Sequence, residues 1–326
     1  MSEREHCCFM FFDYIDFDVL LNARVFYRLA GYTVLESDDL SFCKLLVIFR
    51  GIPTRIFPEY LGTIHFYDYV CEYDIDIFKY FPNASSIITI SMQHSRMASS
   101  HGFFVYGYLP VIPSIWNFSF PFIRRSSSSL HISNYKPLAN DPYQQQLISL
   151  IRAGSVRVYG AKWNRVDIKA RPLSYFEANL KLSTAKVCYG LMYPYQRGKS
   201  LSGRMWQAPI QGCMVISEEG SNLFLCPGVL EMSTYLDVPP QNSLSPAILA
   251  KQASNFWLSQ TEDLARNLNL CLNWENLPSE VIYARWLLFS QHCEFFYKTL
   301  IANSFLKIRR KLSFLSRTIM NKIYGQ

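Results

Sequence analysis

The chain has 326 residues, of which 50% are hydrophobic, 16% aromatic and 17% charged, and its formal net charge is +7. This length is sufficient for two domains with separate cores, and the composition excludes an intrinsically disordered chain. The excess charge lies at the C-terminus, because residues 297–326 hold seven bases and no acid, whereas the other 25 bases are balanced by 25 acids.

Cysteine spacing and hydropathy disfavour two further classes of protein. The nine cysteines are scattered and contain no C-x-x-C pair, which argues against a disulfide framework or a zinc site and favours a reducing cytoplasm. The N-terminal apolar run has acids on both sides and no small-residue cleavage site, which disfavours a secretory signal. No run reaches the roughly eighteen apolar residues of a membrane span. We therefore expect a cytoplasmic protein without such a span.

Short apolar runs alternate with helix-length segments in the first third of the chain. This alternation predicts βαβ units around a parallel sheet. The predicted strands cover 7–12, 32–37, 44–49, 67–74 and 85–91, and the predicted helix covers 18–32. The aromatic, proline-rich stretch 107–122 and RRSSSS at 124–129 are predicted to form an interdomain linker.

The same alternation restarts after the predicted linker. A helix is predicted over 141–154, with Asp141 as its N-cap and Pro142 in its first turn. Further predicted elements are strands at 130–137, 156–160 and 186–194, a helix at 173–185, and a short helix and strand within 200–220. From Ser245 the pattern is helical to the end of the chain.

The pattern as a whole predicts an α/β protein with two Rossmann-like domains, followed by C-terminal helices. The predicted divisions are an N-terminal Rossmann-like domain over 1–125, a C-terminal Rossmann-like domain over 126–260, and C-terminal helices with a basic amphipathic tail over 261–326.

The segment YQRGKSLSGR at 195–204 leads from a predicted strand into a predicted helix. In open α/β sheets, ligands bind beyond the carboxyl ends of the strands, where bases and free backbone N–H groups can hold phosphates. The three bases, two glycines and two serines of this segment therefore predict a diphosphate-binding loop. An ordinary crossover loop with solvated bases is the alternative interpretation.

The sequence RMWQAPIQGCMVISEE at 204–219 resembles a signature in the C-terminal domain of GT-B glycosyltransferases of the "glycosyl transferases group 1" kind. The order of elements after HISNYKP at 131–137 is also similar, and the resemblance spans about residues 130 to 235. It implies a GT-B fold, in which two Rossmann-like domains face each other across a cleft, and a hexosyltransferase-like activity that uses a nucleotide-sugar. In such a fold, residues 1–125 would form the acceptor-side domain and residues 126–260 the nucleotide-sugar-binding domain.

The resemblance also implies donor-binding residues. Arg204 would face the donor diphosphate together with Lys199 or Lys136, and Glu218 and Glu219 would lie near ribose or sugar hydroxyls. Many members have a glutamate where this chain has Gln207, which can hydrogen-bond a sugar hydroxyl but supplies no negative charge. The complete predicted donor set is Asn134, Lys136, Lys199, Ser200, Ser202, Arg204, Gln207, Glu218 and Glu219.

Candidate acceptor-side groups lie in the first domain. His94 follows the predicted strand 85–91, and Asp74 belongs to an acidic cluster at 68–76. Either could accept a proton from an acceptor hydroxyl in an inverting transfer, although loop histidines and turn-capping carboxylates are common without such a role. No metal-ligand spacing is present, so we expect a metal-independent transfer, with Arg204 stabilising the leaving diphosphate and no cofactor besides the donor.

The basic tail at 300–324 has an apolar stripe that runs from Ile301 to Ile319. It could lie on an anionic membrane surface, at the inner face of the membrane and near a lipid-linked acceptor, or it could pack on the first domain. Nucleic-acid binding is not expected, because no known motif accompanies the bases.

The sequence therefore predicts a glycosyltransferase of cell-surface polysaccharide biosynthesis, with a glycan or lipid-linked acceptor. A non-catalytic GT-B-like binding or scaffold protein, and another nucleotide-sugar enzyme such as an epimerase, remain alternatives.

Overall fold

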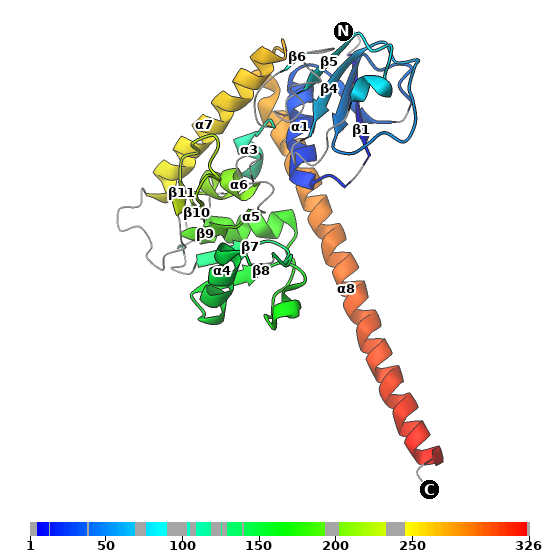
Figure 1. Ribbon diagram of the computed structural model, residues 1–326, viewed down its shortest axis with the longest axis vertical. Helices are drawn as coiled ribbons and strands as arrows, with labels where there is room; N and C mark the ends of the chain where they lie inside the picture. The colour runs from blue at the N-terminus through cyan, green and yellow to red at the C-terminus, as the bar shows by residue number, and fades with distance from the viewer. Residues whose placement is uncertain are drawn as a thin grey trace.

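Two α/β halves and a long C-terminal helix make up the protein (Figure 1). The computed structural model describes residues 5–12, 14–37, 39–68, 76–89, 103–104, 109–118, 125, 129–138, 140–192, 202–232 and 245–324, with side chains up to residue 302 except at 103–104.

The first half is built on a six-stranded parallel sheet with the strand order β2-β1-β3-β4-β5-β6. Its elements are β1 (His6–Phe11), α1 (Phe17–Leu29), β2 (Thr33–Glu36), β3 (Leu45–Phe49), β4 (Thr63–Tyr67), the 3₁₀ turn η1 (Ile77–Lys79), β5 (Ser86–Thr89) and β6 (Phe103–Phe104). Every residue of β3 is apolar and buried, as in a parallel strand that is covered on both faces. The strand order reverses between β1 and β3, which makes this the switch point of the sheet.

The second half is built on a five-stranded parallel sheet with the strand order β11-β10-β9-β7-β8. Its elements are β7 (Ser129–Ile132), α4 (Pro142–Arg152), β8 (Val156–Tyr159), the 3₁₀ turn η3 (Trp163–Val166), α5 (Tyr175–Thr184), β9 (Val187–Gly190), α6 (Arg204–Ile210), β10 (Met214–Glu218) and β11 (Val229–Met232). The switch point here lies between β7 and β9. Two Rossmann-like halves with C-terminal helices confirm the predicted fold class.

Local sequence chemistry sets the ends of several helices. The Asp141 carboxylate accepts a hydrogen bond from the Gln144 backbone N–H at 2.9 Å, and Pro142 opens α4, as predicted. Helix α6 ends before Gly212, whose φ is +71°. A Cβ atom at Gly212 would lie 2.2 Å from the carbonyl oxygen of Pro246, so only glycine allows the following helix to begin so close to this turn.

Residues 109–116, which are part of the stretch predicted as an interdomain linker, belong to the core, and this corrects the prediction for those residues. Residues 109–116 are buried apart from Ser114, and they contain the short helix α3 (Pro113–Trp116). The Asn22 side-chain oxygen in α1 accepts hydrogen bonds from the Ile112 backbone N–H at 2.9 Å and from the Trp116 indole N–H at 3.0 Å. Burial of large apolar side chains is more favourable than their exposure in a solvated linker. The prolines of this stretch therefore lie in a buried turn.

The strand predicted over 67–74 is also displaced in the structure. Strand β4 covers Thr63–Tyr67 and pairs with β3 over its full length. The residues from Ile64 to Tyr67 are buried, His65 included, whereas acidic residues begin at Asp68, where the strand has ended. Residues 69–74, which complete the predicted strand, lie outside the described residues.

Helix α7 (Pro246–Asn267) packs against both halves. Its N-terminal part places Ala253 and Trp257 in a core shared with the second sheet, and its C-terminal part places Leu264 in the core of the first. The predicted divisions at 125 and 260 stay predictions, and α7 continues through the second of them.

Helix α8 (Leu277–Tyr324) follows the 3₁₀ turn η4 (Trp274–Asn276). The Glu280 carboxylate in its first turns accepts two hydrogen bonds from the Arg28 guanidinium, at 2.5 and 3.0 Å, and Ala284 and Leu288 are buried. Figure 1 shows the remainder of α8 running away from both halves. No helix among the described residues is long and apolar enough to span a bilayer.

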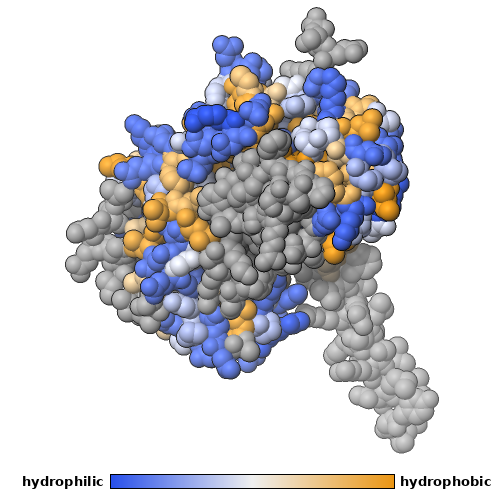
Figure 2. All heavy atoms as spheres, turned by 45° about the horizontal axis from the view of Figure 1, so that its top comes forward, coloured by the Kyte–Doolittle hydropathy of each residue, from blue (hydrophilic) through white to orange (hydrophobic). Residues whose placement is uncertain are grey.

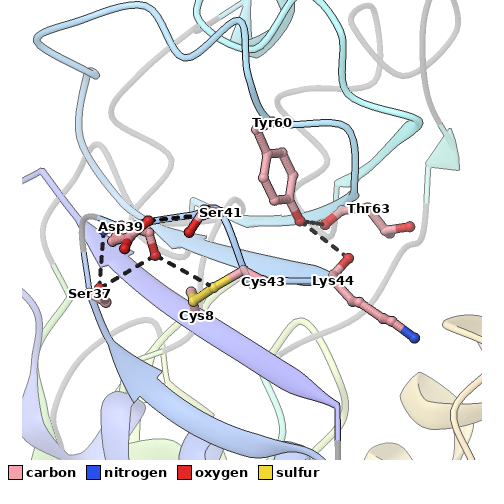
Figure 3. The surroundings of a disulfide bond; sticks show 8 residues. All are labelled: Cys8, Ser37, Asp39, Ser41, Cys43, Lys44, Tyr60 and Thr63. Carbon is pink, nitrogen blue, oxygen red and sulfur yellow. Dashed lines mark hydrogen bonds between the residues drawn. A yellow bond between two sulfur atoms is a disulfide. The ribbon is translucent and has the colours of Figure 1, made fainter.

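A disulfide joins Cys8 in β1 to Cys43, two residues before β3 (Figure 3). Cys7, Cys188, Cys213, Cys226, Cys271 and Cys293 are free. The cysteine spacing argued against a disulfide framework, but the structure contains this one disulfide. The sequence could not indicate this pair, because the two cysteines are 35 residues apart and are brought together only when β3 pairs with β1.

Candidate functional site

The switch points of the two sheets meet at the seam between the halves. Asp16 and Asp18 follow β1 at the start of α1, and Arg50 directly follows β3. From the second half, Gln207 donates from its side-chain nitrogen to the Asp18 carboxylate at 2.6 Å. Ligands of open α/β sheets bind at such points, so this seam is the candidate functional site.

Arg204 is fixed at this seam by two hydrogen bonds. Its Nε atom donates at 2.9 Å to the carbonyl oxygen of Ile132, the last residue of β7, and a second guanidinium N–H donates to the Gln207 side-chain oxygen. Gln207 is fully buried, and its amide group therefore connects the Arg204 guanidinium to the Asp18 carboxylate. The hydrogen-bonded chain Arg204–Gln207–Asp18 links the two halves.

Burial and charge act in opposite directions on the two carboxylates. Burial is the main cause that raises the pKa of Asp18 to about 7, with a further contribution from Asp16, while Arg204 opposes it. Burial also raises the pKa of Asp16, against the opposing positive charges of Arg204, Arg50 and Lys136. Three cations, one from the first half and two from the second, therefore act on one carboxylate.

Two tyrosines complete this part of the seam. The Tyr175 hydroxyl donates to the Asp16 carboxylate at 3.5 Å, and burial raises the pKa of Tyr175 well above its ordinary value. Partial desolvation raises the pKa of Tyr14, and the nearby Asp16 and Asp18 raise it further, although most of its side chain is exposed. An exposed aromatic ring beside a group of cations can stack on a sugar or a base.

The predicted donor residues are only partly brought together. Lys136 is exposed and acts on Asp16, and the Ser202 hydroxyl accepts from the Arg204 backbone N–H at 3.4 Å. Asn134 is exposed, and its side-chain oxygen accepts from the Ala161 N–H at 2.7 Å.

Glu218 has a different environment at the end of β10. It is fully buried, and its carboxylate accepts hydrogen bonds from the Met192 N–H and the Ser217 hydroxyl, both at 2.8 Å. It thereby holds the backbone that follows β9, whereas the next residue, Glu219, is exposed.

Four predicted site residues, His94, Asp74, Lys199 and Ser200, lie outside the described residues. Within the part of the chain that the structure describes, no group of three or more histidine, cysteine, aspartate or glutamate side chains is arranged to hold a metal ion.

The sequence reasoning did not identify Asp16, Asp18 or Arg50. Arg50 directly follows a strand, and Asp16 and Asp18 lie where the chain passes from a strand into a helix. The strand order was needed to show that these two strands flank a switch point. Arg50 carries a backbone signal as well, since its φ of +32° is unusual for a residue with a side chain. Such backbone conformations concentrate at functional sites.

Comparisons with known proteins give structural similarities only. No protein-family model and no curated protein matches the chain. The solved structure of AviGT4, described as a glycosyltransferase involved in avilamycin A biosynthesis, is 11% identical, with 77% of this chain and 87% of that chain covered and a TM-score of 0.45.

Two further solved structures have similar scores. A DNA-modifying β-glucosyltransferase studied with and without uridine diphosphoglucose is 10% identical, with coverage of 89% and 98% and a TM-score of 0.47. A T4 phage enzyme, BGT, in complex with UDP and Mn²⁺ is 10% identical, with coverage of 89% and 97% and a TM-score of 0.43. A shared fold does not by itself specify an activity.

Proposed function

We propose that the protein is a GT-B-type glycosyltransferase that transfers a sugar from a nucleotide-sugar to a glycan or lipid-linked acceptor. The observation that carries the proposal is the position of Arg204, which is bonded to the carboxyl end of β7 at the point where both switch points meet. A guanidinium held in this way can bind two diphosphate oxygens at once and stabilise the charge on the leaving group.

The other roles follow the sequence-based assignments. Lys136 adds a second positive charge beside Arg204, and Lys199, Ser200 and Ser202 remain proposed donor contacts, as does Asn134. His94 and Asp74 remain proposed proton acceptors on the acceptor side. Because the charge of the leaving diphosphate would be met by protein cations, we propose that the transfer needs no metal ion.

The test is calorimetric titration of the protein with UDP, GDP, ADP, CMP and their sugars in buffer that contains EDTA. We expect one nucleotide diphosphate to bind and Arg204→Ala to weaken that binding by about 1.5–3 kcal/mol, the value of a charge-assisted hydrogen bond. Arg157→Ala, which changes an exposed arginine of β8, is the matched control and should bind as the wild type does. Equal affinity of a folded Arg204→Ala variant would contradict the proposed donor site.

One observation favours a second candidate, a binding module that retains the donor site without transfer. The Gln207 side chain is fully buried and each of its two polar atoms is hydrogen-bonded within the protein, so this residue does not face a sugar hydroxyl. Donor binding without turnover, measured with candidate glycan and lipid acceptors, would support this candidate.

We further propose that the C-terminal part of α8 attaches the protein to an anionic membrane surface. Apolar side chains are exposed on α8 beyond its docked turns, with Phe296 60% and Tyr297 66% exposed, and bases without acids continue from Lys298. On the face shown in Figure 2, hydrophobic residues form small groups among hydrophilic ones. A projecting helix with apolar residues and excess positive charge suits an anionic bilayer surface.

Deletion of residues 303–326 should release the protein from vesicles of phosphatidylcholine and phosphatidylglycerol. Since each base near such a surface contributes about 1 kcal/mol, we expect the bound fraction to fall at least tenfold, and binding of the full chain to weaken with salt. Vesicle co-sedimentation measures this, with pure phosphatidylcholine as the control. The unfolding midpoint should not change, and a large loss of stability would show instead that this segment belongs to the core.

A further inference from the structure

The positive charge at the seam comes from both halves of the molecule. Arg204 and Lys136 belong to the second half. Lys136 follows β7, and Arg204 donates a hydrogen bond to the carbonyl oxygen of the last residue of β7. Arg50 belongs to the first half, where its backbone N–H donates to the carbonyl oxygen of Tyr67 at 3.0 Å and fixes the residue at the end of β3. The cations therefore reach the seam from separate sheets.

Asp16 lies among these cations and is held from both sides. It is the N-cap residue of α1, which follows β1, and β1 pairs with β3. The Asp16 carboxylate also accepts a hydrogen bond from the hydroxyl of Tyr175 in the second half. Asp18, two residues further on, is bonded to Gln207, which is bonded in turn to Arg204. These contacts limit how far Asp16 can move from the cations of the second half.

We propose that Arg50 is a diphosphate-binding residue supplied by the first half, and that Asp16 is the internal counter-ion that a diphosphate displaces from Arg50, Arg204 and Lys136. This inference rests on the proposed function, and it adds a residue from the opposite half to the donor site. A carboxylate carries one negative charge whereas a nucleoside diphosphate carries at least two, so the exchange improves the charge balance of three cations. A ligand that contacts both halves would also hold the two sheets together.

This arrangement predicts opposite changes in diphosphate affinity for two substitutions. Removing Arg50 removes a ligand for the diphosphate and should weaken binding. Removing the charge of Asp16 removes a competitor for the cations and should strengthen binding. A purely structural ion-pair network would not produce this pair of results, because loss of either partner would then disturb the site in the same direction.

The test is calorimetric titration with UDP, GDP, ADP, the corresponding nucleosides, and inorganic pyrophosphate. We expect Arg50→Ala to lower the affinity for the bound nucleoside diphosphate about tenfold or more and to leave nucleoside affinity unchanged. Arg50→Lys should retain part of the affinity, and Asp16→Asn should raise it severalfold. Arg55→Ala, which changes an exposed arginine that stacks on Phe57, is the matched control and should bind as the wild type does.

The outcomes separate this inference from the proposed function. Wild-type affinity in Arg50→Ala, with Arg204→Ala still impaired, would overturn the role of Arg50 and leave the donor site intact. Weaker binding in Asp16→Asn would overturn the counter-ion role. Binding of pyrophosphate that depends on Arg50, without binding of any nucleotide, would support the cation site and contradict the sugar donor. No binding of pyrophosphate or nucleotide would overturn both.

Discussion

Replacing Gln207 by glutamate is expected to destabilise the protein by about 3–5 kcal/mol at neutral to alkaline pH, the usual cost of an uncompensated buried charge. Gln207 is fully buried, and its side-chain nitrogen lies 2.6 Å from an oxygen of Asp18. The substitution places two carboxylates in contact where one now receives a hydrogen bond. Arg204 can compensate only one of them.

The destabilisation should increase as the pH rises. Two touching carboxylates share a proton, so their pKa in the folded state is raised above the ordinary value of the unfolded chain. The folded state then binds more protons than the unfolded state, and stability falls as pH rises from about 4 through the raised pKa. Urea unfolding at about pH 5 and about pH 8 should therefore show a much smaller loss at the acidic pH.

A second substitution tests the geometry directly. Asp18→Asn in the Gln207→Glu background again pairs one amide with one carboxylate, but the amide is now at position 18 and the carboxylate at position 207. This double variant should recover most of the lost stability. Gln145→Glu, at an exposed position of α4, is the matched control and should change stability by no more than about 0.5 kcal/mol. If Gln207→Glu were as stable as the wild type at both pH values, the contact with Asp18 would not exist.

The same contact gives a physical reason for the amide at position 207, where many of the glycosyltransferases that the sequence resembles have a glutamate. A glutamate in this helix is compatible with an uncharged or absent partner, but here the facing residue is the buried carboxylate of Asp18. An amide at position 207 can accept from Arg204 and donate to Asp18 at the same time, which a carboxylate cannot do.

Loss of the bridge between Cys8 and Cys43 is expected to lower the free energy of unfolding by about 3–4 kcal/mol. The bridge closes a loop of 35 residues, and a loop of this length corresponds to that amount of chain entropy in the unfolded state. Cys43→Ser, or dithiothreitol added to the wild type, should shift the urea midpoint by the same amount, and reductant should have no effect on the variant.

The matched control for the bridge is Cys293→Ser, which changes an exposed free cysteine of α8. It should leave the midpoint unchanged and the response to reductant intact. A wild-type midpoint that does not respond to reductant would mean that Cys8 and Cys43 are free thiols in the folded protein.

The sequence by itself determined the elements whose signals are local. Asp141 and Pro142 mark the start of α4, the apolar run at 44–49 marks β3, and the alternation of strands and helices marks two parallel α/β halves. These features depend on backbone capping and on burial of contiguous residues, which are encoded within a few positions. The position of Arg204 at the start of a short helix was readable for the same reason.

Only the tertiary structure decided how residues from distant segments combine. Asp18 and Gln207 are 189 residues apart, and their contact depends on how the two halves pack. Arg50 and Asp16 meet the second-half cations only because the strand order places β1 beside β3 at a switch point. Trp116 is buried because Asn22 and α6 surround it, although its own stretch is rich in proline. Each depends on long-range packing, whose energy no local pattern contains.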